Sequence, residues 1–123
     1  MSDLANTVER YLEIWNETDA TRRAEKIREV FTEDATYTDP LGDVSGHEAI
    51  NALIGAVQEQ FAGLTFSLAG AVDTHHDIAR FTWNLAPAGA PEPVAVGFDV
   101  VKAGGDGRLS AVYGFLDKVP AAA

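Results

Sequence analysis

A strand, a turn and the start of a helix are encoded next to one another in residues 35–50, which read ATYTDPLGDVSGHEAI. Residues 35–39 alternate and are rich in threonine and tyrosine, which predicts a short strand. Pro40 ends that strand because proline has no N–H to give to a sheet ladder. Ser45 and Glu48 have the spacing of a capping box, so a helix with Ser45 as its N-cap is predicted to follow.

Two helices are predicted before this stretch, and the third continues from it. Apolar residues recur at helical spacing in all three segments. They are Leu4, Val8, Tyr11, Leu12 and Trp15 in a first helix of about 15 residues, Ala24, Ile27, Val30 and Phe31 in a shorter second one, and Ala49, Ile50, Leu53, Ile54, Val57 and Phe61 in the third.

The second half of the chain changes to the period of strands. Residues 64–72, 78–85, 94–101 and 109–119 are predicted strands, joined through residues 73–77, 87–93 and 104–107. Helices followed by a run of strands indicate an α+β protein. We expect one domain over residues 1–119, in which three N-terminal helices pack on a strongly curved antiparallel sheet. Such a cone has an open mouth that favours a ligand site, and residues 120–123 are expected to form a frayed tail.

The composition limits the classes of partner. The chain has 123 residues, no cysteine and a formal net charge of −10. It has no cluster of Lys and Arg, so neither nucleic acid nor an anionic membrane is an expected partner. The lack of cysteine excludes disulfides, thiolate ligands and a Cys nucleophile. No signal region and no bilayer-length apolar run is visible, so a cytoplasmic protein is expected.

Asp39 is the first candidate for a catalytic residue. It follows Tyr37 on the same strand face and directly precedes Pro40. A carboxylate at the inner end of a strand, facing an apolar cavity, is a candidate general base for a carbon acid. The alternative is a turn-initiating Asp that hydrogen-bonds its own backbone.

Asp99 interrupts the apolar run from Val94 to Val101. A charge in a central strand is costly unless it is paired or neutralised. A buried, protonated Asp99 would donate a hydrogen bond to a substrate oxygen, whereas the alternative is a polar residue that sets strand register or lies on a solvated face. Tyr11, one helical turn from Trp15, is either a donor into the pocket or an ordinary core aromatic.

The usual cofactor and metal motifs are absent, so no cofactor and no metal is expected. His75 and His76 are neighbours in the predicted 73–77 connection, and adjacent strand residues point to opposite faces. We therefore interpret them as exposed turn residues, and His47 as a solvated residue of a helix first turn.

Three segments together resemble a known family. Residues 31–42 (FTEDATYTDPLG), 45–50 (SGHEAI) and 107–116, with Gly107-Arg108-Leu109 and Gly114-Phe115-Leu116, look like SnoaL-like and ketosteroid isomerase-like proteins of the nuclear transport factor 2 superfamily. The resemblance covers nearly the whole chain and implies a cystatin-like, nuclear transport factor 2-like cone. It does not imply one function, because this fold carries isomerases, cyclases, hydrolases and non-enzymes.

The resemblance to bacterial ketosteroid isomerase implies roles for three residues. In that enzyme the base is an Asp just before Pro-Val-Gly, which corresponds to Asp39. One oxyanion donor is the Tyr of an Arg-Tyr pair on the first helix, which Arg10-Tyr11 matches. The other is a protonated Asp in the fourth strand, where Asp99 falls. The segment after Pro40 is shorter than in the isomerase, so the pocket rim should differ.

The predicted substrate pocket is rich in large side chains. The isomerase has smaller aliphatic residues at the positions of both tryptophans, so we expect a smaller and flatter ligand than a steroid. The residues predicted to line the pocket are Trp15, Tyr37, Phe61, Phe81, Trp83, Val101 and Val112.

Two functional hypotheses remain from the sequence. The first is a cofactor-free isomerase or cyclase that moves a proton next to a carbonyl of a small hydrophobic ketone or polyketide-like substrate, with the developing enolate held by preorganised donors. The second is a non-catalytic module that binds a small hydrophobic ligand or dimerises. Hydrolysis with an Asp-Arg-Asp set is disfavoured because no Asp lies two residues from Arg80.

Association into a homodimer is also expected. Related curved sheets usually pair through the convex face. Alternate residues of the last strands would supply an apolar surface there. These are Phe98, Val100, Tyr113 and Phe115.

Overall fold

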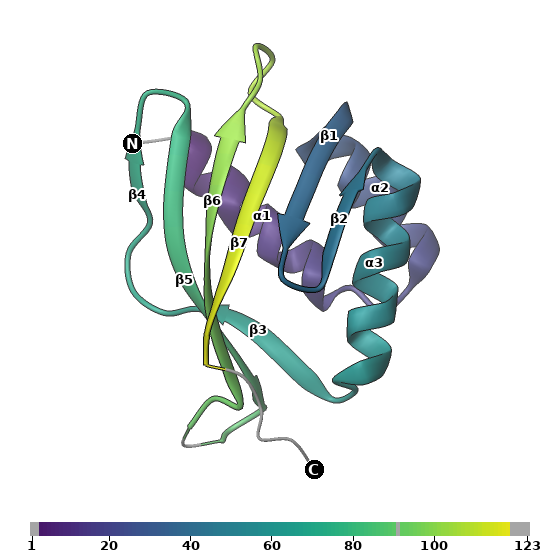
Figure 1. Ribbon diagram of the computed structural model, residues 1–123, viewed down its shortest axis with the longest axis vertical. Helices are drawn as coiled ribbons and strands as arrows, with labels where there is room; N and C mark the ends of the chain where they lie inside the picture. Colours follow the sequence, from purple (N-terminus) through teal and green to yellow (C-terminus); the bar gives the residue numbers. More distant parts are fainter. Residues whose placement is uncertain (1–2, 91, 119–123) are drawn as a thin grey trace.

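Over the residues that the structure describes, the fold consists of three helices and a seven-stranded sheet (Figure 1). A computed structural model describes residues 3–90 and 92–118; the predicted tail 120–123 lies outside the described residues. The elements are α1 (Asp3–Asn16), α2 (Ala20–Val30), β1 (Phe31–Asp39), β2 (Gly42–Ser45), α3 (His47–Gln60), β3 (Leu64–Leu68), β4 (Asp73–His75), β5 (Ile78–Pro87), β6 (Ala95–Ala103) and β7 (Leu109–Lys118).

The sheet has the strand order β2-β1-β7-β6-β5-β3. The strand β4 pairs with Ile78 to Arg80 of β5, which lie outside the stretch that pairs with β3. The predicted α+β class with three N-terminal helices is confirmed. The sheet is mixed and mostly antiparallel, because β1 and β7 run parallel while the other pairs are antiparallel. No tight turn joins β1 to β7, so their direction is set by the long path of chain between them rather than by a hairpin.

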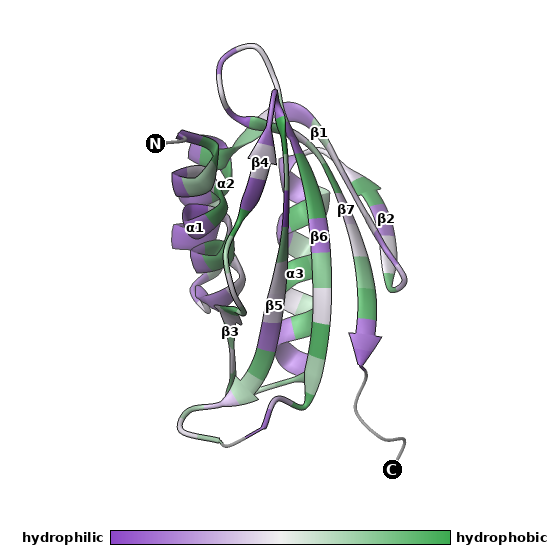
Figure 2. Ribbon diagram, turned by 90° about the vertical axis from the view of Figure 1, so that its left-hand side faces the viewer, coloured by the Kyte–Doolittle hydropathy of each residue, from purple (hydrophilic) through white to green (hydrophobic). Residues whose placement is uncertain are grey.

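The sheet curves around the helices (Figures 1 and 2). Burial alternates along β6, where Ala95, Gly97, Asp99 and Val101 are buried and the residues between them are partly exposed. The concave face therefore meets the apolar stripe of α1, whose buried residues include Val8, Tyr11, Leu12 and Trp15. No helix within residues 3–90 and 92–118 is long and apolar enough to cross a membrane.

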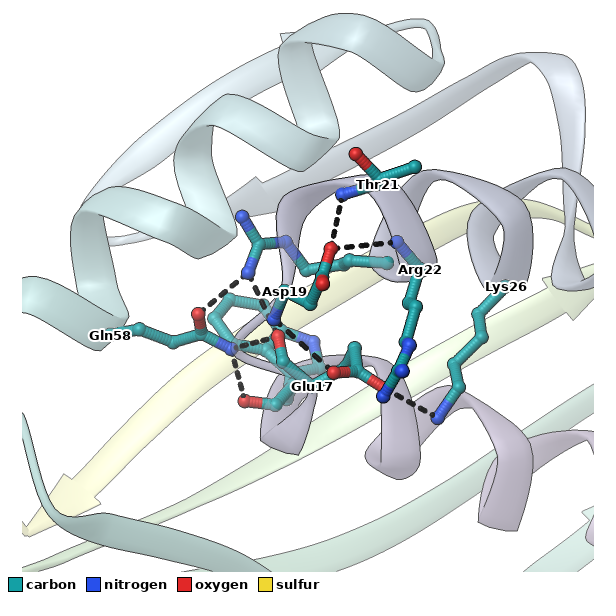
Figure 3. A network of polar contacts seen from close by, with 8 residues as sticks. Glu17, Asp19, Thr21, Arg22, Lys26 and Gln58 are labelled. Carbon is teal, nitrogen blue, oxygen red and sulfur yellow. Dashed lines mark hydrogen bonds and ion pairs between the residues drawn. The ribbon is translucent and has the colours of Figure 1, made fainter.

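The end of α1 is held by a buried polar cluster, part of which is seen in Figure 3. The Gln58 amide of α3 donates to the carbonyl oxygens of Trp15 (2.9 Å) and Glu17 (2.8 Å). Arg23 of α2 donates to Gln58 Oε1, to Asn51 Oδ1 and to the Glu17 carbonyl. Carbonyls at a helix end have no partner within the helix. We call Arg23, Asn51 and Gln58 the α1 clamp.

The predicted capping box is wrong. Ser45 is the last residue of β2 and lies opposite Thr36 in the β1–β2 ladder, so its backbone is extended. The N-cap of α3 is Gly46, with φ of 87° and no side-chain cap. Its N–H instead donates to the Ala35 carbonyl at 2.9 Å. The strand β2 was not predicted, because residues 42–44 follow Pro40 in the expected turn and Ser45 was interpreted as a helix cap.

The second helix ends one residue earlier than predicted, and one short strand was not predicted. The second helix begins at Ala20, because Asp19 caps it by accepting hydrogen bonds from Thr21 and Arg22 N–H groups (Figure 3). It ends at Val30, and β1 already begins at Phe31. The short strand β4 was also missed; its turn into β5 contains His76 at a φ of 52°.

Candidate active site

A pocket of about 350 Å³ lies between the helices and the concave face of the sheet. Its wall is mainly apolar and aromatic, with residues from α1, from α3 and from the sheet. Asp39 and Asp99 are its only charged side chains among the described residues. The lining residues are Leu12, Trp15, Tyr37, Asp39, Leu41, Val57, Gln60, Phe61, Phe66, Trp83, Leu85, Ala95, Asp99 and Leu116.

Asp99 forms the polar floor of the pocket. It lies on β6 among buried residues and is only 3% exposed, which excludes a solvated face. The Tyr11 hydroxyl of α1 donates to its Oδ2 at 2.8 Å. The indole N–H of Trp83 donates to its Oδ1 at 3.2 Å. Two elements far apart in the sequence therefore hold this carboxylate in one orientation.

The protonation of Asp99 is tuned toward neutral pH. Burial raises the pKa of the Asp99 carboxyl to about 6, the hydrogen bonds from Tyr11 and Trp83 oppose this rise, and the charge of Asp39 adds to it. Burial, followed by the charge of Asp99, raises the pKa of the Tyr11 phenol well above its usual value. Tyr11 therefore stays protonated as a donor, while Asp99 is able to change its state near physiological pH.

Asp39 is both a turn-initiating residue and a carboxylate that lines the pocket, so both interpretations from the sequence apply. Its Oδ1 accepts hydrogen bonds from the N–H groups of Leu41 (2.8 Å) and Gly42 (2.9 Å), as expected of a turn-initiating Asp. Its Oδ2 accepts from the Tyr37 hydroxyl at 2.5 Å. Asp39 nevertheless lines the pocket. The turn thus fixes one oxygen, while the other has a lone pair beyond the one used by Tyr37.

Gly114 of β7 separates the two carboxylates. A methyl group added at Gly114 would lie 2.8 Å from Asp99 Oδ1 and 3.1 Å from Asp39 Cβ. Both acidic side chains therefore pack against the same glycine. This close approach explains why the charge of Asp39 acts on the pKa of Asp99.

Gly97 has a similar role for Trp83, its cross-strand neighbour. A methyl group at Gly97 would lie 2.3 Å from Trp83 Cζ2 and 2.5 Å from the Phe115 carbonyl. The indole of Trp83 therefore lies directly over this glycine. That position lets its N–H reach Asp99.

Four aromatic rings form a continuous wall. Tyr37 contacts Trp15 (ring centroids 5.6 Å apart), Trp15 contacts Phe66 (5.3 Å), and Phe66 contacts Trp83 (5.2 Å). We call these four residues the aromatic wall. It begins at the tyrosine bonded to Asp39 and ends at the tryptophan bonded to Asp99. Within the described chain, Trp15 Nε1 is a buried donor that makes no hydrogen bond.

Several predicted positions differ in the structure. Phe81, Val101 and Val112 are buried in the core and do not line the pocket. Phe81 contacts Tyr11 at 5.9 Å, so helix α1 covers this end of the concave face. Tyr11 was predicted to donate into the pocket, but it is not among the lining residues; its hydroxyl donates a hydrogen bond to the Asp99 carboxylate. In contrast, Trp15, Tyr37, Phe61 and Trp83 do line the pocket.

Several residues that line the pocket were not predicted from the sequence. Phe66 and Leu85 lie on strand faces that alternate toward the pocket, so the period of two gave a usable signal for both. Leu41 and Leu116 gave none, because a turn residue and a strand-end residue reach the mouth only through the fold. The donation from Trp83 to Asp99 depends on strand register and on Gly97.

The remaining candidate residues lie elsewhere. Arg80 is exposed and pairs with exposed Asp73 at 3.2 Å, away from the pocket. His75 and His76 are exposed, and residues 3–90 and 92–118 contain no cluster of metal-ligating side chains. His47 is not simply solvated as predicted, because its Nε2 contacts the carbonyl oxygens of Phe31 (3.0 Å) and Thr32 (2.8 Å).

A curved sheet around three helices, with an acidic floor in an apolar pocket, defines a cone-shaped α+β pocket protein. The chain belongs to the SnoaL-like domain family, whose model matches residues 8–112. It is similar to a SnoaL-like family protein from Agrobacterium tumefaciens that carries a provisional isomerase name. That similarity has 38% identity and a TM-score of 0.89, and it covers 95% of this chain and 99% of the other.

More distant solved structures share the fold. A protein from Jannaschia with a provisional SnoaL-like polyketide cyclase name is 18% identical with a TM-score of 0.71, covering 95% of this chain and 90% of the other. A cystatin-like protein from Silicibacter pomeroyi is 16% identical with a TM-score of 0.66, covering 91% and 74%. No curated protein matches the chain. The predicted family and the cystatin-like, nuclear transport factor 2-like fold are confirmed.

Proposed function

We propose that this protein is a cofactor-free enzyme that moves a proton next to a carbonyl group of a small hydrophobic ketone or polyketide-like substrate. The observation that carries the proposal is the pair Asp39 and Asp99, which pack against the same glycine in a pocket with a mainly apolar wall. An apolar site with a few convergent polar groups suits small-molecule chemistry. The provisional isomerase name of the Agrobacterium relative supports the same reaction class.

The geometry supports different roles for the two carboxylates. Asp39 takes a proton from the carbon beside the carbonyl, using the oxygen that the turn leaves available. Asp99, in its protonated form, donates a hydrogen bond to the carbonyl oxygen as negative charge develops there. Returning the proton to another carbon completes an isomerisation, whereas attack of the enolate carbon on a second carbonyl completes a cyclisation.

Tyr11 acts as a positioning residue in this scheme. Its hydroxyl bonds to Asp99 rather than to the pocket, so it orients the carboxyl group and opposes the rise in its pKa. Tyr11→Phe should therefore move the pH profile of turnover upward along the pH axis, in addition to lowering the rate. If Tyr11 were purely structural, Tyr11→Phe would lower the stability of the protein without moving the pH profile of turnover.

Solvent-deuterium exchange tests the proposed proton transfer. Small ketones such as 2-indanone and β,γ-unsaturated ketones are incubated in D₂O, and label next to the carbonyl is measured by NMR. Asp39→Asn should abolish catalysed exchange. Asp43→Asn is the matched control, because Asp43 is exposed on the same hairpin and its side chain accepts a hydrogen bond from the Thr38 hydroxyl. Catalysed exchange that survives Asp39→Asn would contradict the role of Asp39.

The pocket volume favours small substrates. About 350 Å³ lies near the lower end of ligand pockets, and both tryptophans occupy part of the wall. Ketones with one or two rings should exchange faster than four-ring ketones. Trp83→Phe, which replaces the indole by a smaller aromatic ring, should reduce the difference in exchange rate between the small and the four-ring ketones.

A non-catalytic binding module is the second candidate function. The observation in its favour is that Asp39 accepts two backbone hydrogen bonds, as a purely structural turn residue does. This alternative requires that ligand affinity is unchanged by Asp39→Asn and that no label enters a bound ketone.

We also propose that copies of the chain pair through the outer face of the sheet. Phe98 and Phe115 stack there with ring centroids 5.0 Å apart, and Tyr113 and Phe115 are 47% and 53% exposed. Exposed aromatic patches of this kind mark interaction surfaces. Size-exclusion with light scattering should give a dimer at micromolar concentration, and Phe115→Asp should give a monomer. A wild-type monomer would refute this pairing.

A further inference from the structure

The pocket concentrates negative charge without a compensating cation. Asp39 and Asp99 flank Gly114, and no Lys, Arg or His occurs among the described residues that line the pocket. The other titratable groups facing Asp99 are the phenols of Tyr11 on α1 and Tyr37 on β1. From α3, β3, β5 and β7 the lining side chains are uncharged.

Two carboxylates in an apolar site repel each other more strongly than they would in water. One positive charge between them relieves this repulsion. In the free protein, protonation of Asp99, whose pKa burial raises to about 6, relieves this repulsion at low pH. The ionic group of a ligand satisfies the same requirement.

The aromatic wall adds a second preference for positive charge. The faces of aromatic rings carry negative potential and attract cations, most strongly for tryptophan. The wall runs from Tyr37 through Trp15 and Phe66 to Trp83, and thus from one carboxylate to the other. A ligand with an apolar body and a cationic end would meet complementary surfaces at both ends.

We propose that the pocket also binds hydrophobic amines, whose protonated amino group lies between the carboxyl groups of Asp39 and Asp99. The ligand class is a primary or secondary amine attached to one or two hydrocarbon rings. This inference rests on the proposed function in that it concerns the same pocket. It makes such amines competitors of neutral ketone substrates.

The two ligand classes depend on pH in opposite ways. An ammonium group pairs with ionised Asp99, so its affinity rises as pH rises through the pKa of about 6. Between about pH 5 and pH 8 the increase should be about tenfold. A neutral ketone accepts a hydrogen bond from protonated Asp99, so its affinity falls over the same interval.

Intrinsic fluorescence measures binding directly, because the chain has two tryptophans and both line the pocket. The probes are 2-aminoindane, 2-indanone and indane-2-carboxylate, which share one ring system and differ in charge. At about pH 8 the amine should bind at least about tenfold more tightly than the carboxylate. Equal or weaker binding of the amine would overturn the proposal.

Asp99→Asn separates charge pairing from shape. The amide resembles a protonated carboxyl group, so 2-indanone affinity should stay within about threefold while amine affinity at pH 8 falls about tenfold and loses its pH dependence. Asp43→Asn removes the same charge from the exposed part of the hairpin and should leave amine binding unchanged. Unchanged amine affinity in Asp99→Asn, with circular dichroism showing a folded protein, would also overturn the proposal.

The outcomes separate this inference from the proposed function. Amine binding without any catalysed deuterium exchange would leave the cation site standing and remove the enzyme. Exchange that depends on Asp39, without amine binding, would leave the enzyme standing and remove the cation site.

Discussion

The α1 clamp and the carboxylate pair of the pocket are both buried polar clusters, but they are built in opposite ways. In the clamp, the charge of Arg23 is spread over neutral acceptors, namely Asn51, Gln58 and the Glu17 carbonyl. In the pocket, two carboxylates of the same charge lie against one glycine. The polar groups of the clamp therefore have hydrogen-bond partners within the fold, whereas the two carboxylates of the pocket have no cation beside them among the described lining residues.

This difference separates a structural cluster from a chemical one. Buried polar groups stabilise a protein when each has a partner, and they reduce stability when like charges are brought together. Sites that do chemistry often carry such a cost. Removing a charge should therefore lower stability in the clamp and raise it in the pocket.

The largest expected effect comes from breaking the clamp. Arg23→Met fills similar space but removes a donor from three partly buried acceptors, and Arg23 itself is only 5% exposed. The free energy of unfolding should fall by about 3 kcal/mol. Urea unfolding measures this, with Arg22→Met, an exposed neighbour, as the control. Equal stability of the two variants would show that the clamp has no structural role.

Displacing Trp83 breaks the pocket cluster without changing its charge. Gly97→Ala places a methyl group against the indole and the Phe115 carbonyl, so the ring must move away from Asp99. We expect a loss of about 2 kcal/mol and a shift of the tryptophan emission. Gly105→Ala is the control, because nothing lies within 4 Å of its added methyl group. An unshifted emission spectrum in Gly97→Ala would contradict the placement of the indole.

Removing the charge of Asp99 should stabilise the protein. Folding raises the pKa of Asp99 from 3.8 to about 6, so its proton favours the folded state at low pH, and this contribution is lost as pH rises toward 6. Above pH 6 the charged form costs about 3 kcal/mol. Asp99→Asn removes this cost but loses one acceptor, for a net gain of about 1–2 kcal/mol.

Urea unfolding at several pH values measures this gain. The difference between Asp99→Asn and wild type should grow from about pH 4 to pH 6 and then stay level. A difference that does not vary with pH would show that Asp99 does not titrate in this interval.

The smallest expected effect comes from removing one hydrogen bond to Asp99 in the pocket. Trp83→Phe keeps an aromatic ring at this position but removes the N–H that donates to Asp99. Since that bond lowers the pKa of Asp99, its loss should raise the pKa by less than about one unit. A carbon-13 NMR titration of the Asp99 carboxyl follows this shift; a lowered pKa would be the contrary result.

Local pattern predicted much of the fold. The helical spacing in α1 and α3 and the alternation in β5 and β6 reflect burial on one face, which the residues of each element encode by themselves. The predicted capping box was wrong because the residues around Ser45 are compatible both with a helix cap and with the end of a strand. Its pairing with Thr36 decided between them.

The sequence by itself determined the family, the α+β class and the two carboxylates of the candidate site. Only the tertiary structure decided that Tyr11 serves Asp99 rather than the ligand, that Phe81 belongs to the core, and that Trp83 donates to Asp99. The physical reason is that hydrogen bonds and repulsion between side chains depend on distances across the sheet. Strand register and two glycines, Gly97 and Gly114, set those distances.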